Sequence, residues 1–157
     1  MNQTPPILTP TAASAAAKPP GVVAIVDDDP QIAGALGMWL ELQGLGATCH
    51  LSAESLLDLL RLQDGQLTIQ FGGAHPEVVL GAVLDLNLPG KSGVELARML
   101  RALTPDLPIT LITALGVEQR GGYGKLPSGV QCLKKPFDLD ALELALFPLA
   151  APYSVLP

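Results

Sequence analysis

Short apolar runs alternate along the chain with stretches in which apolar residues recur every three or four positions. A short continuous apolar run bounded by turn residues is typical of a buried strand, and the three-to-four spacing is typical of an amphipathic helix. The predicted strands cover residues 22–26, 47–51, 78–84, 109–113 and 130–133. The predicted helices lie between Pro30 and Gly44, from about residue 53, and at 93–103 and 138–147.

Local signals support the first two helices. Pro30 fits the first helical position behind an aspartate N-cap, expected to be Asp29, and Gly44 is suited to end the helix. The second helix is predicted from an apolar stripe at helical spacing. That stripe consists of Leu56, Leu59, Leu60 and Leu62.

The alternation of strands and helices indicates the fold class. It predicts an α/β protein with a doubly wound, five-stranded parallel sheet that is covered by helices on both faces and joined by right-handed crossovers. In such sheets ligands bind at the carboxyl ends of the strands, near the point where strand order reverses. Polar residues at strand ends are therefore the candidates for chemistry.

Two segments depart from this pattern. Residues 64–78 form an insertion before the third strand, and Leu67, Ile69 and Phe71 alternate there with polar residues, which predicts a small extra strand. Its role is open between local packing and a strand edge for a specific partner. Residues 116–129 are rich in glycine, which predicts a degenerate fourth helix of at most one or two turns.

Composition excludes several classes of protein. The 157 residues are 48% hydrophobic, which is enough for one domain with a core. A net charge of −6 argues against direct nucleic-acid binding, and no apolar run approaches the length of a membrane span. Residues 1–20 are expected to be a flexible leader, not a secretory signal. Cys49 and Cys132 form neither a disulfide framework nor a zinc pattern, which suits a cytoplasmic protein.

Polar residues stand at four of the predicted strand ends. Asp27 and Asp28 follow the first strand and Asp85 ends the third. Thr113 ends the fourth strand, and Lys135 follows the fifth. In a parallel sheet these side chains converge, and three carboxylates would repel one another without a cation. The pattern predicts a Mg²⁺ site, with an ammonium group and a hydroxyl group available to an anion beside the metal.

Four segments resemble the signature segments of the response-regulator receiver domain, the CheY-like family. They are VAIVDDDP, VLDLNLPGKSG, LITAL and CLKKPFD, they occur in the family's order, and they span residues 22–138. Each motif is weak alone, but four in register are highly specific. The resemblance implies the flavodoxin/CheY-like strand order 2-1-3-4-5, with a receiver domain over residues 21–149 and a C-terminal tail over 150–157.

The resemblance also implies the chemistry of the acidic residues. Asp85 is the expected phosphoacceptor, which takes a phosphoryl group from a phosphohistidine donor with Mg²⁺ as cofactor. Asp28 is expected to bind the metal directly and Asp27 mostly through a coordinated water. Asn87 is expected to offer its backbone carbonyl to the metal.

Two further residues are expected to contact phosphoryl oxygens after transfer, namely Thr113 and Lys135. These roles match the physics, because phosphoryl transfer needs positioning and neutralisation of charge. Strand alternation sends Lys134 and Lys135 to opposite sides, and only Lys135 precedes a proline. The Lys135–Pro136 peptide bond is expected to be cis, as in relatives.

The sequence also departs from the family pattern. Receivers usually carry Tyr or Phe three residues before the active lysine, as a rotamer switch, but here that residue is Cys132. Together with the Gly-rich segment, this suggests a signal carried by reordering of residues 114–130. The other interpretation is a receiver that only shuttles phosphoryl groups. Leu115 predicts slow loss of phosphate, because an apolar side chain hinders the hydrolytic water.

The sequence therefore predicts a receiver in two-component signalling that is a phosphoacceptor and not an enzyme in the ordinary sense. About ten residues follow residue 147, so a stand-alone receiver that signals by protein–protein contact is expected. The expected partners are a histidine kinase or a histidine phosphotransfer protein and an unknown downstream protein, and a homodimer is left open. The alternative is a receiver-like adaptor that binds partners without phosphorylation. A haloacid-dehalogenase-like phosphatase is rejected, because Asn87 replaces the aspartate that acts there as acid and base.

Overall fold

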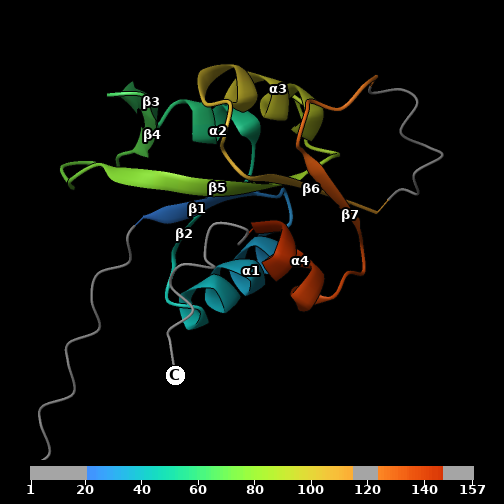
Figure 1. Cartoon of the computed structure of the whole chain (residues 1–157). Helices are drawn as coiled ribbons and strands as arrows, with labels where there is room; N and C mark the ends of the chain where they lie inside the picture. The colour runs from blue at the N-terminus through green and yellow to red at the C-terminus, as the bar shows by residue number, and fades with distance from the viewer. Residues whose placement is uncertain (1–20, 115–123, 147–157) are drawn as a thin grey trace, which may run out of the picture.

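The computed structural model describes residues 21–114 and 124–146, which form a sheet with helices on both sides (Figure 1). Five parallel strands lie in the order β2-β1-β5-β6-β7, which confirms the predicted order, with β5, β6 and β7 as the third to fifth strands. These strands are β1 (Val22–Val26), β2 (Gly46–His50), β5 (Glu77–Asp85), β6 (Ile109–Thr113) and β7 (Gln131–Lys134). The helices are α1 (Pro30–Leu42), α2 (Ala53–Leu57), α3 (Gly93–Leu103) and α4 (Leu139–Leu146).

Two hydrophobic clusters pack against opposite faces of the sheet. Figure 1 shows α2 and α3 above the sheet and α1 and α4 below it. Successive residues of a strand point to opposite faces, so Ala24 belongs to the cluster with α2 and α3, whereas Ile25 belongs to the cluster with α1 and α4. Every residue of β1 is buried, which explains its unbroken apolar sequence.

Capping side chains begin the two long helices. Asp29 is the N-cap of α1 and accepts a hydrogen bond from the Gln31 amide at 2.9 Å, with Pro30 at the first helical position as predicted. Helix α3 begins with a capping box, in which Ser92 and Glu95 each accept a hydrogen bond from the other residue's backbone amide. Asp29 is therefore a cap, as the sequence indicates.

The prediction of a longer second helix is wrong, because α2 ends at Leu57. The last two residues of its predicted apolar stripe lie instead in strand β3 (Leu60–Gln63), which pairs antiparallel with β4 (Gln66–Ile69). Asp64 and Gly65 join the two strands with φ values of 50° and 78°. Two consecutive positive φ values are typical of a type I′ hairpin turn. The chain therefore forms a β-hairpin where a longer helix was predicted.

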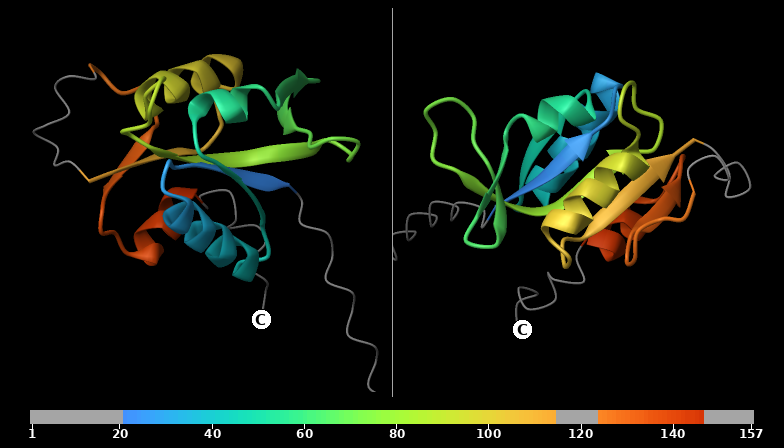
Figure 2. Two further views of the ribbon diagram at one scale, coloured as in Figure 1. Left: turned by 180° about the vertical axis from the view of Figure 1, so that it is seen from behind. Right: turned by 90° about the horizontal axis from the view of Figure 1, so that it is seen from above.

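Strand β4 attaches this hairpin to the sheet. Thr68 lies opposite Val78, and Ile69 lies opposite Glu77, in antiparallel pairing with the first residues of β5. This pairing confirms the extra strand predicted within residues 64–78. Figure 2 shows the hairpin on the same side of the sheet as α2.

The three alternating apolar residues of the insertion differ in how deeply they are buried. Leu67 and Ile69 are buried in the core, with exposed fractions of 2% and 1%. Phe71 lies past the end of β4 with 46% of its surface exposed, and its ring stacks on the buried His50 ring at a centroid distance of 6.1 Å. Local packing therefore accounts for Leu67 and Ile69.

Several sequence-based expectations fall on other parts of the chain. The degenerate fourth helix was predicted within residues 116–129, and residues 116–123 of that segment lie outside the described residues, as do the predicted leader and tail. Residues 124–130 contain no helix. Cys49 lies on β2 and Cys132 on β7, at opposite edges of the parallel sheet, and the two thiols are not joined in a disulfide. Within the described ranges, no helix has the length and apolar character needed to cross a membrane.

Candidate functional site

The carboxyl ends of four neighbouring strands bring the predicted site residues to one edge of the sheet. Asp27 follows β1 and Asp85 ends β5. Thr113 ends β6, and Lys135 follows β7. Carboxylate oxygens of Asp27, Asp28 and Asp85 lie within 4.8 Å of one another. These three aspartates form the acidic cluster.

The Lys135 ammonium group lies against this cluster. Its Nζ donates a hydrogen bond to Asp27 Oδ2 at 3.1 Å and lies 3.5 Å from Asp85 Oδ2. The neighbouring Lys134 is exposed on β7. The structure therefore brings Lys135, and not Lys134, to the two carboxylates.

Asp27 is the most deeply buried member of the cluster. Its exposed fraction is 0%, its amide donates to the His50 carbonyl at 3.0 Å, and its Oδ1 accepts from the Asp29 amide at 2.9 Å. Asp28 is exposed beside it. A buried carboxylate is costly unless it is paired, and the ammonium group of Lys135 supplies that pair.

Burial and charge act together on Asp85. Only 6% of the residue is exposed, and its Oδ1 accepts a hydrogen bond from the Asn87 amide at 3.3 Å. Desolvation and then the negative charge of Asp27 raise the pKa of Asp85, while Lys135 and the Asn87 amide oppose the rise. The cluster thus holds more negative charge than its lysine neutralises.

This donor set fits a small divalent cation. Carboxylate oxygens are the ligands that Mg²⁺ prefers, and three of them stand together here with one ammonium group. Asn87 lies two residues after Asp85, and its backbone amide donates a hydrogen bond to the Asp85 carboxylate. The backbone carbonyl of Asn87 therefore lies at the same edge of the sheet. The acidic cluster and the Asn87 carbonyl are therefore the groups that could hold Mg²⁺.

Thr113 stands on the strand that separates Asp85 from Lys135. It is 1% exposed, and its carbonyl accepts a hydrogen bond from the Lys135 amide at 2.6 Å. The peptide bond from Lys135 to Pro136 is cis, as expected. All five predicted side chains thus lie at the same edge of the sheet.

Two residues that support this edge were not singled out from the sequence. Gly93 lies so close to the carbonyl group of Asp85 that a side chain would meet its backbone. The Glu54 carboxylate accepts a hydrogen bond from the Lys91 amide at 3.1 Å, in the loop that follows Asp85. Gly93 is the first residue of α3, directly after the N-cap Ser92, and nothing in the local sequence indicates either contact.

The raised pKa of Asp85 leads to a prediction about stability. In metal-free protein, Asp85→Asn is expected to raise the melting temperature at neutral pH by a few degrees, because it removes a carboxylate whose charged form is disfavoured in the folded state. The folded state of the parent binds a proton at higher pH than the unfolded chain, so the parent recovers stability as the pH falls through that raised pKa. Melting curves of both proteins between pH 4 and 8 should therefore converge at low pH. A variant less stable than the parent at pH 7 would contradict this account.

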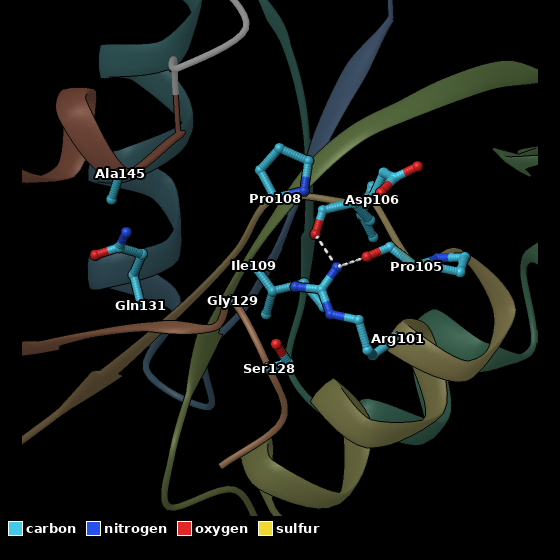
Figure 3. Close-up of a pocket in the computed structure, with 10 residues that line it drawn as sticks. Arg101, Pro105, Asp106, Pro108, Ile109, Ser128, Gly129, Gln131 and Ala145 are labelled. Carbon is cyan, nitrogen blue, oxygen red and sulfur yellow. Dashed lines mark hydrogen bonds between the residues drawn. The ribbon is translucent and has the colours of Figure 1, made fainter.

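A separate hollow of about 320 Å³ lies at the opposite ends of β6 and β7 (Figure 3). Arg101 crosses it and donates hydrogen bonds from Nη1 to the carbonyls of Pro105 at 2.6 Å and Leu107 at 2.7 Å. Its guanidinium group thus fixes the connection between α3 and β6. The acidic cluster is not part of this hollow and lies at the other edge of the sheet.

The fold is a doubly wound parallel sheet. Its carboxyl edge carries three aspartates, a threonine and a lysine, so the chain is an α/β protein with an acidic site that includes a lysine. The family model of the response regulator receiver domain matches residues 23–147. The chain therefore belongs to the response regulator receiver domain family, as its four sequence motifs indicate.

Individual relatives agree with this assignment. The chain is 31% identical over 127 residues to the probable transcriptional regulatory protein TcrX of Mycobacterium tuberculosis. The matched region covers 81% of this chain and 48% of that protein. It is 35% identical over 128 residues to the C4-dicarboxylate transport transcriptional regulatory protein DctD of Pseudomonas aeruginosa, with coverages of 76% and 23%. A solved response regulator receiver protein from Sinorhizobium medicae WSM419 has a TM-score of 0.64 at 22% identity, over 83% of this chain and 94% of that one, which shows the shared fold.

The chain spans about half or less of the length of these two curated relatives. Both are named as transcriptional regulatory proteins, and the matched part of each is only a portion of its chain. The comparisons therefore establish the receiver domain. Its action without an attached output domain stays a prediction.

Proposed function

We propose that Asp85 accepts a phosphoryl group from a phosphohistidine of a histidine kinase or a histidine phosphotransfer protein. The observation that carries this proposal is the convergence of the acidic cluster and the Lys135 ammonium group at one edge of the sheet. Membership in the receiver family supports it, because receiver domains are phosphoacceptors. The protein is accordingly proposed to act in the cytoplasm, by contact with other proteins.

The transfer itself is a displacement at phosphorus. A carboxylate oxygen of Asp85 attacks the phosphorus atom, the P–N bond to the donor imidazole breaks, and the bonding electron pair stays on the imidazole nitrogen. The products are an acyl phosphate on Asp85 and a free histidine. Such a transfer depends mainly on positioning and on neutralisation of charge, which are the two properties of this edge of the sheet.

The acidic residues are proposed to share the metal. Asp28 would bind Mg²⁺ directly, Asp27 mostly through a water molecule, and Asn87 through its backbone carbonyl, together with the Asp85 carboxylate. When bound, the ion supplies positive charge to the phosphoryl oxygens. The pKa of Asp85 is raised by burial and then by the negative charge of Asp27, and a bound cation would favour the charged carboxylate against both effects.

Lys135 and Thr113 are proposed to bind the transferred group. The Lys135 ammonium group lies 3.5 Å from Asp85 Oδ2, so it can exchange this ion pair for a phosphoryl oxygen without crossing the site. The Thr113 hydroxyl would donate to another phosphoryl oxygen. Thr113 ends β6, which pairs with β5, and Lys135 follows β7, which pairs with β6.

Signal output is proposed to differ from the usual receiver. Cys132 is half-buried on β7 and packs against the cluster that includes α2 and α3. A thiol is too small to act as the bulky rotamer switch of other receivers. We therefore retain the proposal that phosphorylation reorders residues 114–130, with transfer of the phosphoryl group to another protein as the alternative.

A small phosphodonor tests the proposed function directly. The parent and Asp85→Asn are incubated with acetyl phosphate and Mg²⁺, and the intact mass of each is measured. The parent is expected to gain the mass of one phosphoryl group, and the variant is expected to gain none. Chelation of Mg²⁺ should prevent the gain in the parent.

The competing function, a receiver-like adaptor without phosphorylation, is favoured by Cys132 at the usual switch position. It predicts a different result in the same experiment. A parent protein that stays at its original mass with Mg²⁺ and phosphodonor present would support the adaptor and reject the proposed function.

A further inference from the structure

The loop between β5 and α3, residues 86–92, carries one of the proposed metal ligands. It begins directly after Asp85 and contains Asn87, whose backbone carbonyl is proposed to face Mg²⁺. This ion demands near-ideal octahedral geometry, so a small displacement of one oxygen ligand weakens binding. The path of the loop backbone is therefore a determinant of metal affinity.

Contacts hold this loop at both of its ends. The Leu86 amide donates to the Ile112 carbonyl at 2.8 Å, and the Leu88 side chain is buried in the core with 8% exposed. At the other end, the Ser92 amide donates to Glu95 Oε2 at 2.9 Å within the capping box of α3. The stretch between these anchors contains Pro89, which has no amide hydrogen to donate.

Glu54 supplies a contact to this middle stretch from another element. Its Oε1 accepts a hydrogen bond from the Lys91 amide at 3.1 Å, across 37 residues of sequence. A Cβ atom built on Gly90 would lie 2.9 Å from Glu54 Oε1, which shows how closely the loop backbone approaches the carboxylate. The Lys91 amide is also the main cause that lowers the pKa of Glu54.

Helix α2 holds Glu54 in place for this contact. The residue lies in the first turn of α2. Two other residues of this helix, Ala53 and Leu56, are completely buried and attach the helix to the core. Ser52 caps the helix by accepting a hydrogen bond from the Ser55 amide at 3.1 Å. The Glu54 side chain itself is exposed, so its removal leaves no cavity in the core.

We propose that Glu54 is a positioning residue, which holds the 86–92 loop against α2 and thereby fixes the Asn87 carbonyl for Mg²⁺. This proposal rests on the proposed function, since it requires the acidic cluster to bind Mg²⁺. The carboxylate acts through the Lys91 amide and does not touch the metal. A side chain that keeps the acceptor oxygen without the charge should therefore keep most of the effect.

Titration calorimetry with MgCl₂ alone tests the proposal on four proteins: the parent, Glu54→Ala, Glu54→Gln and the control Glu143→Ala. Loss of a residue that orients a metal ligand typically weakens metal binding by about 10-fold, and this is the expected effect of Glu54→Ala. Glu54→Gln is expected to stay within about twofold of the parent, because its amide oxygen can still accept from Lys91. Glu143 is exposed on α4, and its removal changes the net charge equally without touching the loop.

Hydrogen exchange of the metal-free proteins provides a second measurement. Amides of residues 86–92 should exchange faster in Glu54→Ala, while amides of β1 and β6 keep the rates of the parent. This pattern separates a loosened loop from general unfolding.

Three outcomes would overturn the inference. The first is unchanged Mg²⁺ affinity in Glu54→Ala, and the second is an unchanged exchange rate of its loop. The third is an equal loss of affinity in Glu54→Gln and Glu54→Ala, which would assign the effect to charge alone. A parent that binds no Mg²⁺ would instead reject the proposed function, and the inference would fail with it.

Discussion

The variant Gly93→Ala is expected to lose about 3 kcal/mol of unfolding free energy and most of its phosphorylation, although it gains only one methyl group. A Cβ atom on Gly93 would meet the carbonyl group of Asp85, with 2.9 Å to its carbon, and would lie 3.0 Å from the Leu86 Cα atom. These are backbone atoms, which cannot rotate away as a side chain can. The start of α3 and the end of β5 would have to separate.

This separation would also disturb the site. The Gly93 amide donates to the Leu86 carbonyl at 3.0 Å, and the Leu86 amide pairs with the Ile112 carbonyl on β6. Movement of α3 therefore acts on the segment that carries the Asp85 carboxylate. Reduced stability and reduced phosphoryl uptake are expected together, because they have the same cause.

Gly34→Ala is the matched control for this experiment. Gly34 is exposed on α1, and a Cβ atom there would meet no other atom within 4 Å. Alanine favours helix over glycine by about 1 kcal/mol, so this variant should be more stable than the parent. Urea unfolding and phosphoryl uptake are measured for all three proteins. Parental values for both quantities in Gly93→Ala would show that the close approach to Asp85 is not required.

Much of the fold could be predicted because its elements are locally consistent. Residues 93–103 and 109–113 were assigned from the sequence with the same bounds as α3 and β6. The first has apolar residues at helical spacing and begins after the capping box of Ser92, and the second is a short, largely apolar run that is buried throughout. Local pattern and tertiary structure agree there, so the pattern is sufficient.

The region after α2 could not be predicted in this way because its pattern is ambiguous. Leu56, Leu59 and Leu60 fit a helical stripe, but Leu60 and Leu62 also fit the alternation of a strand. The decisive interaction is the pairing of β4 with the start of β5, which depends on residues further along the chain. The Asp64-Gly65 pair was a local signal for a hairpin, because this dipeptide favours a type I′ turn.

The acidic site could be predicted for a different reason. Its members are unusual residue types at strand ends, and a parallel sheet brings the carboxyl ends of its strands to one edge. Gly93 and Glu54 have ordinary residue types, and their roles depend on distances to Asp85 and Lys91. Such roles become visible only in the three-dimensional structure.

Lys135→Met is expected to slow phosphorylation of Asp85 by about 100-fold or more, which is the typical effect of removing one preorganised hydrogen-bond donor from an active site. The Lys135 Nζ lies 3.1 Å from Asp27 Oδ2 and 3.5 Å from Asp85 Oδ2. Methionine has a similar length but no charge, so two buried carboxylates would lose their ammonium partner. The phosphoryl group would lose a proposed contact at the same time.

The same substitution should lower the stability of the protein and make it depend on Mg²⁺ more strongly than the stability of the parent does. Removal of one partner of a buried ion pair costs about 3 kcal/mol or more, because the remaining charge is left without compensation. The pKa of Asp85 should rise further, since Lys135 is one of the groups that lower it. The stability gap between variant and parent should therefore shrink as the pH falls and the carboxyl group takes up a proton.

Melting temperatures with and without MgCl₂, and phosphoryl uptake from acetyl phosphate, measure both effects. Mg²⁺ is expected to raise the melting temperature of Lys135→Met more than that of the parent, because the ion replaces the lost positive charge beside the aspartates. Lys134→Met is the matched control, since Lys134 is the exposed neighbour on β7 and makes the same change in net charge. It should behave as the parent in both measurements. Equal effects of the two substitutions would mean that the position of Lys135 against Asp27 and Asp85 has no special role.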